Sequence, residues 1–144
     1  MAEKVLVVDD EQHIRDIVSN YLSREGYEVA VASNGEEAIE LAAIENPELI
    51  LLDIKMPGLD GLETCHRIKR QKETSHIPVI MVTALGDRDV DAYLEGADDF
   101  VTKPFDAAEL SIRVKSMLRI RHLKNELDRA MAYIEELRDN LSHL

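Results

Sequence analysis

Carboxylates, a hydroxyl and an amine stand at the ends of short apolar segments in this sequence. The segments are KVLVVDD, LILLD, IPVIMVT and DDFVTK, and the polar residues at their ends are Asp9 with Asp10, Asp53, Thr83 and Lys103. Short apolar runs between turn-forming residues are typical of strands buried on both faces. If these strands lie side by side, three carboxylates, one hydroxyl and one amine meet at one edge of the sheet.

Three carboxylates at one place repel each other, so a positive charge must lie among them. Lys103 supplies one such charge. The remaining side chains offer only oxygen, which suits a hard divalent ion such as Mg2+. A Mg2+ site beside a lysine and a hydroxyl fits a phosphoryl group, and a carboxylate can itself accept that group to give an aspartyl phosphate.

Asp53 could also have a purely structural role or belong to an enzyme. The loop MPGLDG follows it, so the carboxylate could simply cap a turn. Enzymes with an aspartyl-phosphate intermediate and a dehalogenase-like fold carry a second Asp two residues later, where this chain has Lys55. The glycine-rich signatures of nucleotide-binding loops are missing after the first strand. We therefore expect that the protein does not turn over a free substrate and is not an enzyme.

The elements that position these residues alternate between strand and helix. A further strand, YEVAVA, spans residues 27–32, and Ser33 is the expected N-cap of the helix that follows it. We expect helices over about residues 11–25, 33–46, 62–72 and 86–96, and a long helix from about Asp106. Such alternation predicts an α/β fold, with a doubly wound parallel sheet and helices on both faces. Ligands of these sheets bind beyond the carboxyl ends of the strands.

Residues 1–118 resemble the receiver domain of response regulators in two-component signalling. The resemblance rests on VLVVDDE, LLDIKMPGLDG, VIMVTA and FVTKPF, which follow one another in this order, each at a strand end. It implies a flavodoxin-like five-stranded sheet with the order 2-1-3-4-5. It also implies that Asp53 accepts a phosphoryl group from a histidine kinase or a phosphotransfer protein.

The same resemblance assigns roles to the other residues of the site. Asp10 would bind Mg2+ directly, Asp9 mainly through water, and the backbone carbonyl of Lys55 would join Asp53 as a further ligand. Thr83 would donate a hydrogen bond to a phosphoryl oxygen, and Lys103 would form an ion pair with the phosphoryl group. The peptide between Lys103 and Pro104 is expected to be cis. Phe100 would be the aromatic switch residue. Phosphorylation would then draw Thr83 inward and let Phe100 turn in.

The C-terminal segment, residues 119–144, carries a heptad repeat. Its a positions are Ile120, Leu127, Ile134 and Leu141, and its d positions are Leu123, Ala130, Leu137 and Leu144. The pattern predicts a helix of roughly 39 Å that pairs as a parallel coiled-coil homodimer. Two alternatives stay open: a solvated single helix, and a helix that packs back on its own receiver. Because the repeat reaches the last residue, we expect a longer natural protein with an output domain.

Composition limits the other partners. The chain has 144 residues, is 45% hydrophobic and carries a net charge of −12, all of it within residues 1–118. This acidity argues against a nucleic-acid surface. No apolar run reaches the roughly 18 residues of a membrane helix, and the N-terminus lacks a signal peptide, so we expect a cytoplasmic protein without a membrane partner.

The competing function is a scaffold that dimerises without any phosphorylation of Asp53.

Overall fold

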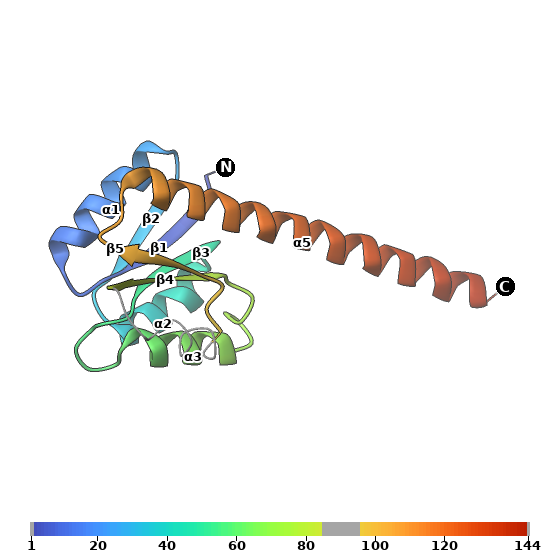
Figure 1. Ribbon diagram of the computed structural model, residues 1–144. Coiled ribbons are helices and arrows are strands. Elements are labelled where there is room, and N and C mark those ends of the chain that lie inside the picture. The colour runs from blue at the N-terminus through green and yellow to red at the C-terminus, as the bar shows by residue number, and fades with distance from the viewer. Residues whose placement is uncertain (1, 85–95, 144) are drawn as a thin grey trace.

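A parallel five-stranded sheet forms the centre of the molecule (Figure 1). The structure is a computed structural model that describes residues 2–84 and 96–143. The strands are β1 (Lys4–Val8), β2 (Glu28–Ala32), β3 (Leu49–Asp53), β4 (Val79–Ala84) and β5 (Asp99–Lys103). Their order in the sheet is β2-β1-β3-β4-β5. This confirms the flavodoxin-like fold expected from the sequence.

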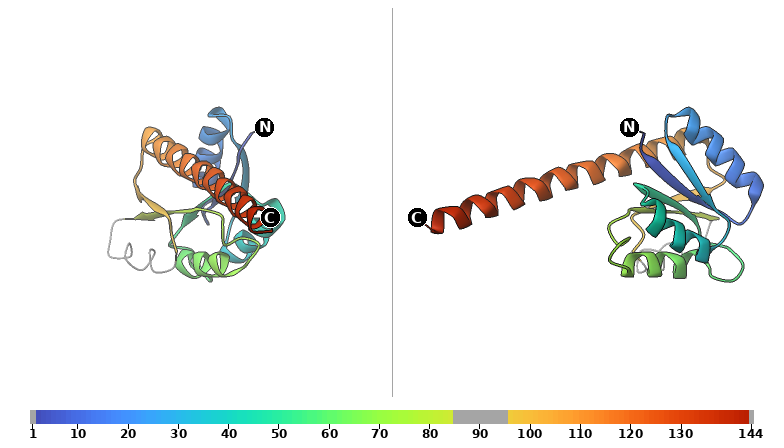
Figure 2. Two further views of the ribbon diagram at one scale, coloured as in Figure 1. Left: turned by 90° about the vertical axis from the view of Figure 1, so that its right-hand side faces the viewer. Right: turned by 180° about the vertical axis from the view of Figure 1, so that it is seen from behind.

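Helices cover both faces of the sheet (Figure 2). They are α1 (Gln12–Arg24), α2 (Gly35–Glu45), α3 (Gly61–Arg70) and α5 (Ala107–Ser142). The helices α1 and α5 pack on one face, and α2 and α3 pack on the other. The short helix expected over residues 86–96 falls almost entirely outside the described residues.

The central strand β3 is buried along its whole length. Successive side chains of a strand point to opposite faces, so Leu49 and Leu51 pack toward α1 and α5 while Ile50 and Leu52 pack toward α2 and α3. Burying each of these side chains stabilises the fold by about 1.5–3 kcal/mol. The continuous apolar run therefore fixes the strand that delivers Asp53 to the edge of the sheet.

The N-terminus of α2 differs from the sequence-based prediction. The N-cap is Asn34, whose side chain accepts a hydrogen bond of 2.9 Å from the backbone N–H of Glu37. The predicted cap, Ser33, instead donates to the Glu37 carboxylate over 3.3 Å. A Cβ at Gly35 would lie 2.2 Å from Oγ1 of Thr64. Close packing thus requires glycine at the first position of α2, so the cap falls on the residue before it.

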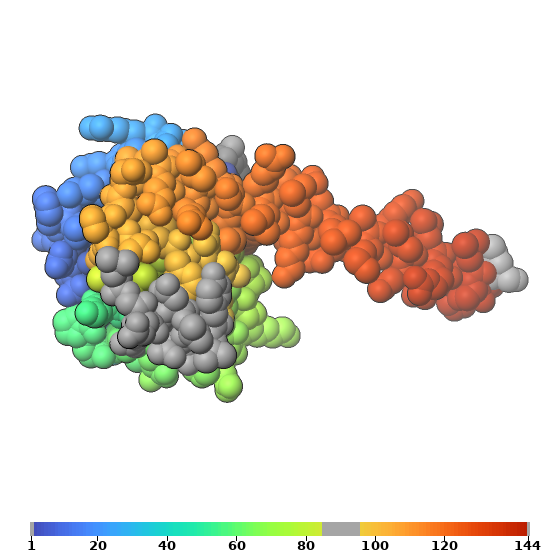
Figure 3. Space-filling view, in the orientation of Figure 1, coloured from blue at the N-terminus to red at the C-terminus, as the bar shows by residue number. Residues whose placement is uncertain are grey.

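The last helix, α5, continues far beyond the sheet. Asp106 caps it by accepting a 2.7 Å hydrogen bond from the backbone N–H of Glu109. Its buried residues end at Leu118, and Figure 3 shows the rest of the helix extending away from the body. Residues 122–143 are exposed, so this part of the tail does not pack back on the described residues that precede α5. Within the described part of the chain, no helix is long and apolar enough to cross a membrane.

Candidate functional site

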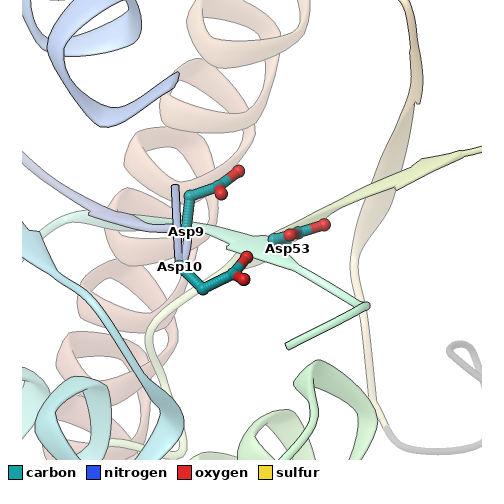
Figure 4. Close-up of side chains that lie close together, drawn as sticks. All are labelled: Asp9, Asp10 and Asp53. Atoms are coloured by element: carbon teal, nitrogen blue, oxygen red, sulfur yellow. The ribbon is translucent and has the colours of Figure 1, made fainter. Parts of the chain in front are cut away.

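Three carboxylates meet at the carboxyl edge of the sheet. Asp9 and Asp10 follow β1, and Asp53 is the last residue of β3, the strand beside it. One oxygen atom from each residue lies within 4.8 Å of those from the other two. Figure 4 shows the three side chains side by side at this edge. The close approach expected from the strand ends is therefore present.

The amine of Lys103 reaches this cluster from β5. Its Nζ lies 3.2 Å from Oδ2 of Asp9 and 3.4 Å from Oδ1 of Asp53. Asp9 and Asp53 are buried, with 3% and 5% of their surface exposed, whereas Asp10 is exposed. The peptide between Lys103 and Pro104 is cis, as the resemblance implied. One ammonium thus faces three carboxylates, which leaves the site with excess negative charge.

The electrostatics of the cluster are visible in the pKa of Asp53. Burial, the charge of Asp9 and the charge of Asp10 raise this pKa to about 6, and Lys103 only partly opposes the rise. Burial also lowers the pKa of Lys103, but the nearby charges of Asp53 and Asp9 outweigh it, so the net shift is upward. Both shifts mean that additional positive charge would stabilise the ionised carboxylates.

The donor set fits Mg2+. All three clustered side chains offer carboxylate oxygen, the ligand that this ion prefers, and the exposed position of Asp10 leaves one side open to water and to a phosphoryl group. Lys55 lies two residues beyond Asp53 and is exposed. The excess negative charge around the buried Asp53 is the feature that a divalent ion would neutralise.

Backbone contacts around Asp9 hold the first strand end in place. Oδ1 of Asp9 accepts a 2.9 Å hydrogen bond from the backbone N–H of Glu11, and the guanidinium of Arg15 donates to the backbone oxygen of Asp9 over 2.6 Å. Sequence reasoning did not single out Arg15. Its position on the first turns of α1, beside an acidic strand end, is the signal that could have found it.

Sequence reasoning did not single out Gly61 either, although it packs against the backbone of Asp53. A Cβ at Gly61 would lie 2.2 Å from the backbone oxygen of Asp53 and 2.6 Å from Cα of Ile54. The N–H of Gly61 donates a 2.8 Å hydrogen bond to the oxygen of Ile54. The start of α3 therefore packs directly against the backbone that carries Asp53, which only glycine permits.

Thr83 and Phe100 lie on the two adjacent strands β4 and β5. Thr83 is buried, and its hydroxyl donates a 2.7 Å hydrogen bond to the backbone oxygen of Ala84. Phe100 is half-buried and packs against the core on the α2 and α3 face. Met81, two residues before Thr83, belongs to the same core, so the side chains of Thr83 and Phe100 share this face of the sheet.

Comparison with known proteins decides the family. A model of the response regulator receiver domain matches residues 5–115. The chain belongs to this family. Receiver domains accept a phosphoryl group, bind Mg2+ at an acidic pocket of the kind formed by Asp9, Asp10 and Asp53, and are generally not enzymes beyond their own dephosphorylation.

Solved structures of receiver domains are similar to this one. The chemotaxis protein CheY4 of Vibrio cholerae is 30% identical, over 81% of this chain and 99% of that one, with a TM-score of 0.78. The receiver domain of a signal transduction histidine kinase from Syntrophus aciditrophicus is 38% identical, over 82% and 91%, with a TM-score of 0.76. NtrX of Brucella abortus is 39% identical, over 89% of this chain but 29% of that one, with a TM-score of 0.82.

Proposed function

We propose that this receiver domain is a cytoplasmic phosphoacceptor switch in which Asp53 takes a phosphoryl group from a histidine kinase or a phosphotransfer protein, with Mg2+ required. The observation that carries the proposal is the environment of Asp53. Its carboxylate is buried at a strand end, lies 3.4 Å from the ammonium of Lys103 and has a pKa raised to about 6. This environment supports a role in accepting an electrophilic group over a role in capping a turn.

The metal ligands in this proposal are Asp10 directly, Asp9 mainly through water, Asp53 and the backbone carbonyl of Lys55. The clustering of the three carboxylates supports this assignment. When bound, Mg2+ supplies positive charge that offsets both the carboxylates and the oxygens of a phosphoryl group. The contact of Glu11 and Arg15 with Asp9 keeps the first strand end in position for that role.

Lys103 and Thr83 respond to the new group on Asp53. Lys103 already lies against Asp53 and pairs with a phosphoryl oxygen. The Thr83 hydroxyl gives up its bond to Ala84 and donates to another of these oxygens. Phe100, on the same face of the sheet, then turns into the space that Thr83 leaves. The surface formed by β5 and α5 is thereby biased toward a second conformation.

The tail, residues 119–144, passes this change on as a parallel coiled coil with a second copy, while residues 1–118 form the receiver. The a and d side chains described in the structure are exposed, six of them large: Ile120, Leu123, Leu127, Ile134, Leu137 and Leu141. They lie roughly 140–240° around the helix from Val114, which faces the sheet. Ile120 still borders the receiver at a hollow that it lines with His76 and Asp98, whereas the five residues beyond it point away from the receiver. Leu144, the last d position, lies outside the described residues.

A repeat of this kind is complementary to itself, so a second copy is the partner that fits it.

The coiled coil leads to an output domain. In NtrX the matched region is only 29% of the chain, so a similar receiver there is part of a longer protein.

One observation favours a second candidate function. The apolar stripe of the tail is exposed along a continuous helix, and pairing through it needs no change at Asp53. A phosphorylation-independent dimerisation adaptor with a receiver fold would look the same.

Intact mass and oligomeric state together test both functions. The protein is incubated with Mg2+ and a small phosphoryl donor such as acetyl phosphate, with Asp53→Asn as control, and each sample is then analysed by mass spectrometry and sedimentation. We expect one added phosphoryl group in the wild type only, with a change in dimer strength or shape. A dimer that forms without any gain in mass, after Mg2+ binding is confirmed, would identify the adaptor instead.

A further inference from the structure

Positive charge is concentrated where α5 leaves the receiver. Residues 110–125 contain no Asp or Glu, although the chain as a whole carries a net charge of −12. The same stretch holds five bases, here called the basic collar: Arg113, Lys115, Arg119, Arg121 and Lys124. Residues 1–109, in contrast, contain 24 acids and 10 bases. The collar is therefore opposite in charge to the receiver that precedes it.

Only part of the collar is neutralised by the receiver. Arg113 pairs with Asp99 over 3.0 Å, and Lys115 lies 4.0 Å from a Glu25 carboxylate oxygen. The guanidinium of Arg121 donates to a neutral group, the backbone oxygen of Pro47, over 3.4 Å. Arg119 and Lys124 are exposed and form no ion pair with any carboxylate of residues 2–84 or 96–143.

The surroundings of Lys124 add positive charge instead of removing it. Lys124 lines a hollow of about 230 Å³ together with Arg121, Lys69, His76 and Asp98. The Asp98 carboxylate is already bound to the Lys69 ammonium over 2.9 Å and to the backbone N–H of Val79 over 2.8 Å. Burial, and then the charges of Arg121 and Lys69, lower the pKa of His76, which reflects the same positive field. The adjacent surface therefore leaves the charge of Lys124 uncompensated.

The heptad positions show what a second copy would bring to this place. With Ile120 at a and Leu123 at d, Arg119 occupies position g and Lys124 position e. In a parallel pair, a g residue faces the e residue of the following heptad on the other chain. Arg119 of each copy therefore faces Lys124 of the other, and the two-fold symmetry doubles this like-charge contact.

The later heptads of the tail have no such conflict. Glu126 at g faces Met131 at e, and Tyr133 at g faces Arg138 at e. The like-charge contact is thus confined to the first heptad after the receiver.

We propose that Arg119 and Lys124 make the first heptad of the paired tails electrostatically repulsive, so that the second copy is held mainly by the later heptads. This inference rests on the coiled-coil dimer proposed above. Repulsion between exposed charges changes a dissociation constant by about two- to fivefold per pair, whereas one buried aliphatic side chain changes it by more than about tenfold. The copies still pair, but the end beside the receivers is the weakest and the first to open.

A charge-reversal cycle on the full chain tests this pairing. Lys124→Glu turns both like-charge contacts into opposite-charge contacts, so we expect the dimer dissociation constant to fall about tenfold at low ionic strength. The double variant Arg119→Glu with Lys124→Glu restores like charges and should return the dissociation constant to near the wild-type value. The effect of Lys124→Glu should shrink in about 1 M salt, where the Debye length is about 3 Å.

Arg129→Glu is the matched control, because it makes the same change of charge at position c, away from the partner helix. Sedimentation equilibrium gives the dissociation constants, and circular dichroism confirms the helix content. A double variant that binds more tightly than Lys124→Glu alone would overturn the pairing, because net charge alone would then explain the trend. Equal effects of Lys124→Glu and Arg129→Glu would overturn it too. If wild type and all variants stay monomeric, the proposed dimer itself fails, and the phosphoacceptor role is unaffected.

Discussion

Asp53 carries a charge that its surroundings only partly neutralise. Burial and the neighbouring Asp9 and Asp10 raise its pKa to about 6, against 3.8 for a free side chain. Between these two values the folded protein holds a proton that the unfolded chain has released. The contribution of Asp53 to stability therefore falls as the pH rises from about 4 to about 6. Above that range the loss of stability caused by the ionised carboxylate stays constant.

Replacing this charge should stabilise the protein at neutral pH. We expect Asp53→Asn to raise the free energy of unfolding by on the order of 1–2 kcal/mol at pH 7 without divalent ions, and to flatten the pH dependence between pH 4 and 6. Urea denaturation across this pH range measures both effects. Glu73→Gln, at an exposed position, is the control that should change little. A less stable Asp53→Asn protein at pH 7 would show that the pairing with Lys103 outweighs the repulsion.

Mg2+ should stabilise the wild type more than it stabilises Asp53→Asn. Because the ion offsets the repulsion among the three carboxylates, we expect millimolar Mg2+ to raise the melting temperature of the wild type clearly and that of Asp53→Asn much less. Differential scanning calorimetry with and without the ion measures this difference. Equal shifts in both proteins would mean that Asp53 takes no part in binding the metal.

The polar residues of the site could be found from the sequence because each ends an apolar run. A parallel sheet brings the carboxyl ends of its strands to one edge, so Asp9, Asp53 and Lys103 were expected there once the strands were recognised. The strand order implied by the resemblance then placed them near one another. Arg15 could not be found in this way. Its bond to the backbone oxygen of Asp9 depends on the path of the loop between β1 and α1, which carries no periodic signal.

At the scale of elements, α3 and β3 are coupled through Gly61. The close approach at this residue lets the first turn of α3 lie on the backbone of Asp53 and Ile54. The start of α2 differed from the prediction for a related reason. Ser33 has the side chain of an N-cap, but the packing of Gly35 against Thr64 places the cap on Asn34. Tertiary packing of this kind leaves no trace in local sequence preference.

A side chain at position 61 should disturb both the fold and the site. Because the added Cβ of Gly61→Ala would meet backbone atoms at 2.2 Å and 2.6 Å, we expect a loss of roughly 2–4 kcal/mol in the free energy of unfolding and weaker Mg2+ binding. Gly26→Ala serves as the comparison. Its Cβ would have open space but a φ of 96°, so it should cost about 1 kcal/mol and leave Mg2+ binding intact. Denaturation and metal titration together distinguish the two variants.

At the scale of the whole molecule, α5 belongs to two structures at once. One side of it, with Leu110 and Val114, completes the core of the receiver, and the opposite side of its extension carries the exposed heptad stripe. The two faces were separable in the sequence because the apolar positions change phase after Met117. A change in how α5 sits on the receiver therefore rotates or shifts the stripe along with it, since the helix is continuous from Ala107 to Ser142.

This arrangement predicts that association and receiver stability can be separated. Ile134 lies at an a position, where burial of its side chain on pairing would stabilise the dimer by about 1.5–3 kcal/mol per copy. Ile134→Asp places a charge there instead, so we expect a monomer. The receiver should keep its melting temperature and its capacity for phosphorylation, because Ile134 is exposed and far along the tail. Ala132→Asp puts the same charge at position f, on the outside of a coiled coil, and should leave the dimer intact. Light scattering coupled to size exclusion measures the mass, and equal association of the two variants would place the partner on another face of α5.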